Sequence, residues 1–315
     1  MKAKNPASKP KRLVIATRRS RLALWQAEHV KAQLEARTPC LEVALLPLST
    51  RGDELLDARL DDAGGKGLFI KELESAMAAG RADIAVHSMK DVPAELPPGF
   101  ALAAISARED PRDAFVSVKY ENFKGMPARS VVGTSSLRRE AQIAARYPGL
   151  EIRLLRGNVE TRLAKLERGE YDAVVLAVAG LARLGLAARI RVRLPAEEIL
   201  PAPGQGALGI ECLAERADVI ELAAALADPA SAACVRAERA VSLALGGSCT
   251  IPLGAFAEKA GERLRLRALV ASPDGKRIAR VDCEGAAAEP EALGARAAAE
   301  LRARGAAEIL ASIGK

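Results

Sequence analysis

The sequence predicts an α/β protein with two α/β lobes that enclose a cleft, followed by a small C-terminal α+β domain. Over the first two-thirds of the chain, short apolar runs alternate with helical patterns. Such alternation is typical of α/β architecture with largely parallel sheets. Two Pro-containing segments, 107–112 and 200–206, interrupt the alternation, and after about residue 226 the pattern changes.

Short apolar runs predict the strands of the first lobe, at 13–16, 41–48, 83–86 and 101–106. Ser20 is a suitable N-cap for the helix after the first strand. Its buried face is expected to hold Leu22, Trp25, Val30 and Leu34. A second helix, 68–79, is expected to stop at Gly80, because glycine favours the C′ position.

The second lobe repeats the pattern, with strands expected at 114–118, 131–133, 152–155 and 173–177. The C-terminal part predicts a helix at 231–245, a tight loop at 246–250 and three strands, at 253–257, 263–271 and 276–283. Ser, Pro, Asp and Gly at 272–275 predict a turn. One Ala-rich helix is expected from 289 to 313.

The two interruptions are interpreted as crossovers by which the chain leaves the first lobe, builds the second and returns. The expected domains are 12–106 with 207–226, then 112–200, then 229–315. Ligands commonly bind in the cleft between two such lobes.

The composition narrows the classes of partner. A net charge of +7 over 315 residues favours acidic partners. Aromatic residues are 3 % of the chain, which argues against single-stranded nucleic acid, since its binders use aromatic stacking. The polar, basic start of the chain lacks the apolar segment of a secretory signal, and no apolar run reaches the ~18 residues of a membrane span. We therefore expect a cytoplasmic protein.

One of the five cysteines stands out by its context. Cys249 lies between small residues and a proline, in Gly246-Gly247-Ser248-Cys249-Thr250-Ile251-Pro252, so it is a candidate attachment point. A hydrolase nucleophile is the alternative, but it needs a nearby base, and neither histidine has an obvious claim to that role. The chain has no CxxC pair and only two histidines, so we expect no zinc site and no need for a metal. The remaining cysteines, Cys40, Cys212, Cys234 and Cys283, are expected to pack without reacting.

Several joints at helix starts carry arginine or lysine together with serine or glycine, at 17–20, 64–67, 134–139 and 156–158, with Arg162 one turn later. Helix N-termini attract anions, and guanidinium groups match carboxylates. Any single arginine could be a solvated surface residue, but four such joints favour a cleft lined with anion receptors. The GGKG segment lacks the spacing of a Walker A loop, so a nucleotide is not indicated.

The segment Val86-His87-Ser88-Met89-Lys90-Asp91-Val92-Pro93 follows another short strand. Its local sequence leaves two roles open for Asp91, a turn residue or a catalytic carboxylate. His87 is expected to be a core histidine with a satisfied hydrogen bond.

Eight motifs, in order along the chain, resemble the hydroxymethylbilane synthase (porphobilinogen deaminase) family. They read IATRRSRLALWQ, GGKGLFIKELE, DIAVHSMKDVP, VVGTSSLRR, LLRGNVETRL, AGLARLG, LPAPGQGALGIEC and ERAVSLALGGSCTIPLG. The resemblance covers nearly the whole chain. It implies two lobes of the periplasmic-binding type. It also implies a monomeric transferase of heme biosynthesis that condenses four porphobilinogen molecules into a linear tetrapyrrole.

The resemblance also implies a dipyrromethane cofactor in thioether linkage to Cys249, and it makes Asp91 the catalytic aspartate. The implied cofactor-binding residues are Lys90, Thr134, Ser136, Arg138 and Arg139. Implied substrate-binding residues are Arg18, Ser20, Arg156, Arg162, Lys66, Phe69, Arg183 and Gln205. Lys66 and Phe69 fall on a segment that is mobile in the family.

This chain departs from many relatives at two motifs. Arg21 stands where many have proline, and Gly246-Gly247-Ser248 stands where many have Glu-Gly-Gly before the cysteine. Both leave the implied site residues in place.

Two other functions compete with the enzyme. A two-lobed, non-catalytic binder of small polycarboxylates would explain the cleft but not the third domain or the Cys249 loop. A nucleic-acid binder would explain only the charge.

Overall fold

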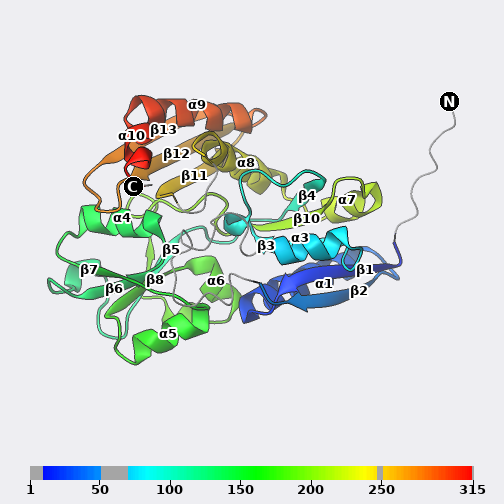
Figure 1. Ribbon diagram of the computed structural model, residues 1–315, viewed down its shortest axis with the longest axis horizontal. Coiled ribbons are helices and arrows are strands. Elements are labelled where there is room, and N and C mark those ends of the chain that lie inside the picture. Colours follow the sequence, from blue (N-terminus) through cyan, green and yellow to red (C-terminus); the bar gives the residue numbers. More distant parts are fainter. Residues whose placement is uncertain (1–9, 51–69, 247–250, 314–315) are drawn as a thin grey trace.

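The computed structural model describes residues 10–50, 70–246 and 251–313. Within them the strands form two five-stranded sheets and one three-stranded sheet. Figure 1 shows the three sheet-containing parts arranged around a common centre, with the C-terminal part above the other two. The expected α/β fold class with a smaller C-terminal sheet is confirmed.

The first sheet has the order β2-β1-β3-β10-β4. Its strands are β1 (Arg12–Arg18), β2 (Glu42–Leu48), β3 (Ile84–Ser88), β4 (Phe100–Ile105) and β10 (Leu208–Leu213). Helices α1 (Arg21–Arg37) and α7 (Ala217–Ala224) pack on one face of this sheet, and α3 (Lys71–Ala78) packs on the other. Alternate residues of β1 therefore serve different cores: Leu13 and Ile15 face α1, whereas Ala16 faces α3.

The second sheet has the same arrangement, with the order β7-β6-β8-β5-β9. Its strands are β5 (Asp113–Val116), β6 (Val131–Thr134), β7 (Glu151–Leu154), β8 (Ala173–Ala177) and β9 (Val192–Leu194). Helix α4 (Leu137–Arg146) covers one face, and α5 (Val159–Glu167) and α6 (Val178–Arg183) cover the other.

The expectation of largely parallel sheets is only half right. β1 pairs in parallel with β2 and β3, and β6 with β7 and β8, but β10 and β5 pair antiparallel with both of their neighbours. The reason is topological. β5 and β10 are the first strands that the chain builds after it crosses from the other sheet. Each enters its sheet at the end opposite to the one where its neighbouring strands begin.

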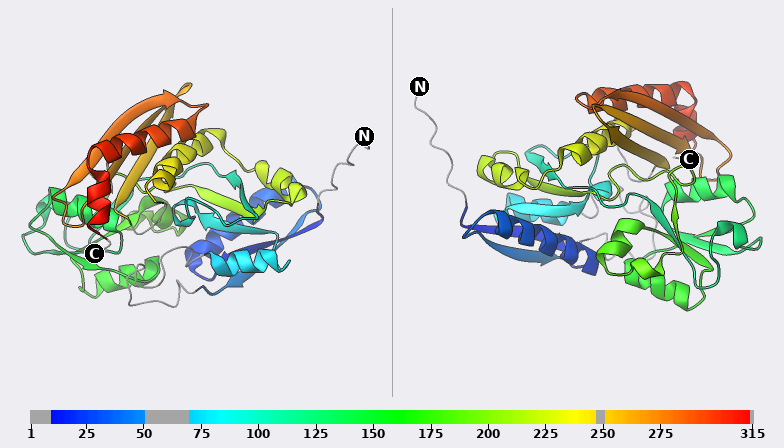
Figure 2. Two further views of the ribbon diagram at one scale, coloured as in Figure 1. Left: turned by 45° about the horizontal axis from the view of Figure 1, so that its top comes forward. Right: turned by 180° about the vertical axis from the view of Figure 1, so that it is seen from behind.

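The C-terminal sheet is an antiparallel meander of β11 (Leu253–Ala260), β12 (Arg263–Ala271) and β13 (Ile278–Ala286). Figure 2 shows its helices on one face, and α8 (Pro229–Ala244) and α9 (Pro290–Ala303) pack there in a shared core. The single closing helix expected from 289 to 313 is wrong. Gly305 adopts φ 91°, which ends α9 and starts α10 (Ala306–Ala311).

Helix α1 confirms one local expectation and corrects another. Ser20 caps it, since its Oγ accepts from Ala23 N. Trp25, however, is 37 % exposed, and Gln26 and Ala27 are buried instead. Trp25 stacks on His29 and lies beneath the guanidinium of Arg183, so it faces α6 of the second lobe rather than its own sheet.

The cysteines also divide differently from the expectation. Cys212 and Cys234 are buried and Cys283 is half-buried, as packing residues should be. Cys40 is exposed, on a residue with φ 65°, so it takes no part in a core. The reason is its position in the tight turn between α1 and β2.

The two crossovers between the sheets lie side by side. Glu109 N donates to Gly206 O, and a Cβ on Gly206 would stand 2.3 Å from Glu109 O, so only glycine fits there. Arg108 on the first crossover donates to Gln205 O and to both oxygens of Glu238 on α8. Glu238 also accepts from Gly204 N and Ala257 N. One buried carboxylate thus joins the crossovers to the C-terminal sheet.

A second buried carboxylate cluster lies between α3 and the first sheet. His87, on β3, is buried and lies 2.8 Å from Glu211 on β10, which confirms the expected core histidine with a partner. Glu74 on α3 shares a hydrogen bond with Glu211. Two carboxylates can share a bond only if one carries a proton. Burial first, and then the charge of Glu211, raise the pKa of Glu74 to about 7, while Lys71 opposes the shift.

This geometry makes Glu74 a source of pH-dependent stability. Because its pKa is raised on folding, its contribution is largest below the ordinary carboxyl pKa and is lost as the pH rises through about 7. Glu74→Gln keeps a hydrogen-bond donor to Glu211 and cannot ionise. We expect it to be more stable than the wild type at pH 8, by about 1–2 kcal/mol, with a gain that shrinks toward pH 5. Urea unfolding at both pH values measures this, with Glu221→Gln on the exposed side of α7 as control. A loss of stability at pH 8 would contradict the assignment.

Candidate active site

A cavity of about 600 Å³ lies between the two lobes, at the strand-to-helix joints of both sheets. Among the residues that line it are most of those expected from the sequence: Arg18, Ser20, Lys90, Asp91, Ser136, Arg138, Arg139, Arg156, Arg162, Arg183 and Gln205. The joints meet here because the strands they follow end at the same edge of each sheet. Lys66, Phe69 and Cys249 lie outside the described residues.

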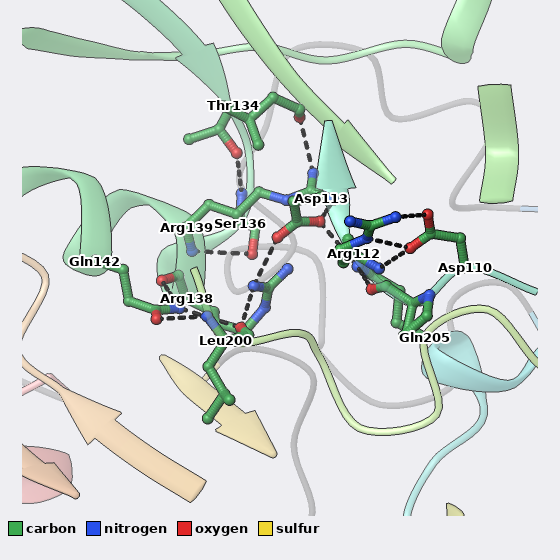
Figure 3. Close-up of polar contacts among 12 residues, drawn as sticks. Asp110, Arg112, Asp113, Thr134, Ser136, Arg138, Arg139, Gln142, Leu200 and Gln205 are labelled. Carbon is green, nitrogen blue, oxygen red and sulfur yellow. Dashed lines mark hydrogen bonds and ion pairs between the residues drawn. The ribbon is translucent and has the colours of Figure 1, made fainter. Parts of the chain in front are cut away.

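The N-terminus of α4 carries two of these arginines. Ser136 caps the helix and accepts from Arg139 N. Thr134 does not line the cavity; its Oγ1 accepts from Ser136 N, so it shapes the turn beneath the cap. Figure 3 shows the side chains of Arg138 and Arg139 converging on Asp113, the first residue of β5. The N–O distances are 2.8 and 2.7 Å.

The turn between β7 and α5 positions another group of cavity residues. Asn158 caps α5 and accepts from Thr161 N. Gly157 has φ 108°, and a Cβ there would lie 2.7 Å from Thr161, so this turn requires glycine. Arg162, one turn into α5, donates from Nε to Gly157 O at 2.8 Å. The bond fixes the side chain of Arg162, which lines the cavity.

Desolvation and mutual repulsion both disfavour the charged forms of the basic side chains in the cleft. Desolvation first, and then Arg139, lower the pKa of Lys90 to about 8. Desolvation, Arg139 and Arg156 lower the pKa of Arg162 to about 10. Asp91 acts on both groups in the opposite direction. Cations that repel one another in a partly desolvated cavity gain free energy when an anion enters, so this site is suited to a polyanion.

Two further side chains that line the cavity form hydrogen bonds to the backbone of the crossovers. Arg183 donates from Nη2 to Gly206 O at 2.6 Å. Gln205 is 1 % exposed and donates from Nε2 to Pro111 O and to Asp113 Oδ1. Both side chains therefore line the cavity while they hold the backbone that connects the lobes.

Sequence reasoning missed three polar residues near the site. Gln26 donates to Ser88 Oγ at 2.8 Å, and both line the cavity. The sequence could have revealed Gln26, since a polar residue on the buried face of α1 needs a hydrogen-bond partner. Asp113 carried no such signal, because a single aspartate at the start of an apolar strand is common.

A smaller cavity of about 90 Å³ lies next to the first, beneath the C-terminal domain. Lys90, Ser136 and Arg138 line both cavities. Ser242, near the end of α8, and Ile251, just before β11, also line the smaller one. Ser242 and Ile251 therefore share this cavity with two cations of the cleft, Lys90 and Arg138.

Comparison with known proteins decides the family. Residues 13–221 match the porphobilinogen deaminase dipyrromethane cofactor-binding domain, and residues 232–303 match the porphobilinogen deaminase C-terminal domain. A porphobilinogen deaminase of Methylobacillus flagellatus is 57 % identical over 96 % of this chain and 98 % of its own. One of Bordetella parapertussis is 59 % identical over 96 % of both chains.

The chain belongs to the porphobilinogen deaminase family. It is accordingly a transferase that uses a dipyrromethane cofactor. The resemblance and the activity class expected from the motifs are confirmed.

Solved structures of lower similarity were also found. The methionine-binding protein MetQ is 12 % identical, with a TM-score of 0.43 over 69 % of this chain and 90 % of its own. The aliphatic sulphonate binding protein SsuA of Escherichia coli is 13 % identical, with a TM-score of 0.42 over 74 % of this chain and 70 % of its own. Among the residues described, no helix is both long and apolar enough to cross a membrane.

The residues at the N-terminus of α4 fit the carboxylates of a dipyrromethane. Nε of Arg138 and Nε of Arg139 are buried N–H groups without an acceptor among the described residues. Buried donors require a partner, and both side chains line the cavity. A carboxylate bound there would complete their hydrogen bonding.

The lowered pKa of Lys90 predicts a pH limit on anion binding. As the pH rises through about 8, Lys90 loses its charge, so the cofactor-free variant Cys249→Ser should bind a dicarboxylate such as succinate more weakly. Lys90→Arg, which stays charged, should hold its affinity over the same range. Calorimetric titration at pH 7 and pH 9 measures the change. As a matched control, Lys119→Arg alters a lysine that pairs with Asp172 away from the cavity. Equal loss of affinity in Lys90→Arg and its parent would contradict this prediction.

Proposed function

We propose that this chain deaminates four porphobilinogen molecules and condenses them head to tail into the linear tetrapyrrole hydroxymethylbilane, with release of ammonia. Each pyrrole ring of such a substrate carries an acetate and a propionate. The observation that supports the cleft as the site is its set of converging, partly desolvated cations. The non-catalytic binder is not favoured, since both domains of the enzyme family match the chain.

The proposed cofactor site lies where the two cavities meet. Cys249 is proposed to hold the dipyrromethane through a thioether, and Lys90, Ser136, Arg138 and Arg139 to bind its carboxylates. The support is that Ser242 and Ile251, which lie before and after 247–250 in the chain, line the same small cavity as three of these side chains. When bound, the dipyrromethane supplies the free pyrrole carbon to which the first substrate is joined. Thr134 is proposed to act through the turn that positions Ser136.

The remaining cleft residues are proposed to bind substrate and the growing chain. Those described in the structure are Arg18, Ser20, Arg156, Arg162, Arg183 and Gln205, and Lys66 and Phe69 are assigned to the same role from the family motifs. Gln205 and Arg183 also donate to backbone carbonyls of the crossovers, so their proposed role includes fixing the position of one lobe relative to the other.

We also propose the domain limits expected from the sequence, 12–106 with 207–226, 112–200 and 229–315. The two crossovers, which contact each other at Gly206 and Glu109, support the double exchange between lobes. A cytoplasmic monomer that binds no nucleic acid is the proposed state. Light scattering of the purified protein, and cell fractionation, test these last points.

The proposed attachment is tested by mass. The wild-type protein should be heavier than its sequence by two pyrrole units, and Cys249→Ser should have the sequence mass. Cys40→Ser is the matched control, because Cys40 is exposed and distant in sequence from the loop. It should keep the extra mass. An active wild-type protein with the unmodified mass would refute the attachment.

Asp91 is proposed to stabilise the cation that forms when ammonia leaves the aminomethyl group of the substrate. That charge is delocalised onto the pyrrole nitrogen, and a carboxylate near the N–H lowers the energy of the transition state. Asp91 follows β3 in a short 3₁₀ helix and faces the cleft beside Lys90. Its charge acts on both Lys90 and Arg162, so it lies among the groups proposed to bind the anionic substituents.

Asp91→Asn keeps the shape of the side chain and removes its charge. We expect it to fold and to lose more than about 99 % of turnover, a barrier increase of at least ~2.7 kcal/mol. Asp91→Glu restores the charge on a longer arm and should keep a small, measurable rate. Single-turnover release of ammonia measures both, with cofactor content checked by mass. Near-wild-type turnover in cofactor-loaded Asp91→Asn would exclude Asp91 from the mechanism.

A further inference from the structure

Asp113 is a buried carboxylate that belongs to none of the roles above. It begins β5, directly after the first crossover, and its exposure is 0 %. Oδ1 accepts from Arg139 Nη2 at 2.7 Å and from Gln205 Nε2 at 2.9 Å, and Oδ2 pairs with Arg138 Nη1 at 2.8 Å (Figure 3).

The charges around Asp113 explain why it stays ionised. Burial alone would raise its pKa, but Arg138 and Arg139 hold the pKa well below the usual range of an aspartate. In return, Asp113 opposes the repulsion that Arg138 and Arg139 exert on Lys90. Asp113 therefore stabilises the charges of Arg138, Arg139 and Lys90, and Asp91 adds to its effect on Lys90.

We propose that Asp113 is the internal counter-ion of the cofactor-binding arginines, a positioning residue that keeps the receptor folded and aimed before a carboxylate of the cofactor arrives. The inference rests on the proposed function for the identity of that carboxylate. Its geometric basis is independent of it: one carboxylate is shared by two buried guanidinium groups that line a ligand cavity.

The hydrogen bonds of each guanidinium show how the aiming works. Arg139 donates from Nη1 to Val175 O and from Nη2 to Asp113, while Arg138 Nη1 is held between Leu200 O and Asp113. The Nε atom of each is left without an acceptor among the described residues. The protein thus holds each guanidinium through Nη atoms, and the Nε of each is the donor proposed to bind a ligand.

Asp113 also links the receptor to the connections between the lobes. It terminates the first crossover, and Gln205, which binds it, lies on the second. Arg138 is further tied to Leu200 O, at the start of that second crossover. Hydrogen bonds therefore connect the α4 end of the cleft directly to the two segments that join the lobes.

The counter-ion role predicts that an added anion can replace Asp113. In the cofactor-free background Cys249→Ser, Asp113→Asn leaves buried cations uncompensated and should lower the Tm by about 10 °C. Succinate should then raise the Tm of this variant at least twice as much as it raises that of its Cys249→Ser parent, because its carboxylates supply the missing charge. Sodium chloride at equal ionic strength should not reproduce the effect.

Asp172→Asn in the same background is the matched control. Asp172 is another aspartate of the second lobe, bonded to Val131 N and paired with Lys119, but it does not line the cavity. It should lower the Tm without increasing the response to succinate. If Asp113→Asn responds to succinate no more than Asp172→Asn does, Asp113 is merely structural and the proposal is overturned.

A charge-matched double variant covers the case in which Asp113→Asn does not fold. Asp113→Asn with Arg139→Gln removes one negative and one positive charge, so it should fold and melt above the single variant. Failure of the double variant to fold as well would overturn the proposal, since Asp113 would then be needed regardless of the charge it balances. These measurements use succinate as the probe and require no cofactor. They remain decisive even if the mass of the wild-type protein refutes the attachment at Cys249.

Discussion

The cost of burying positive charge constrains this structure more than any other interaction. A cleft that binds polyanions must concentrate guanidinium and ammonium groups, yet each one loses hydration and repels its neighbours, as the lowered pKa values of Lys90 and Arg162 show. The fold offsets this cost with an internal carboxylate. Asp113 pairs with two arginines that line the cavity, and the Nε of each has no acceptor among the described residues.

The same solution recurs where the three parts of the chain meet. Glu238 is fully buried on α8, and it binds Arg108 from the first crossover and Gly204 N from the second. The crossovers can lie side by side because Gly206 has no side chain to collide with Glu109. Cleft and C-terminal sheet are therefore connected through backbone segments whose polar groups are satisfied by buried charged residues. Apolar contacts add to these bonds: Val235 of α8 packs with Met89 of the first lobe, and Phe256 of β11 packs with Ala141 of α4.

The sequence predicted most of the secondary structure and most of the residues that line the cavity, because both depend on local patterns. Apolar runs marked the strands, and capping residues such as Ser20 and Ser136 marked helix starts. Two of the errors were non-local. Trp25 was assigned to the wrong face because its partner, Arg183, comes from the other lobe, and the antiparallel insertion of β5 and β10 depends on the crossovers. Asp113 could not be recognised, since its meaning comes from arginines 25 and 26 positions later.

Two buried carboxylate clusters show why burial alone does not identify a functional group. Glu74 meets another carboxylate, Glu211, and burial raises its pKa to about 7, so it forms its hydrogen bond as an acid. Asp113 is buried at least as deeply, but it meets two guanidinium groups and stays ionised. The first cluster joins α3 to its sheet, away from the cleft lining; the second lies at the cavity wall. What separates a structural carboxyl from one that organises a binding site is therefore the sign of the charge it faces and whether its partners have donors left for a ligand.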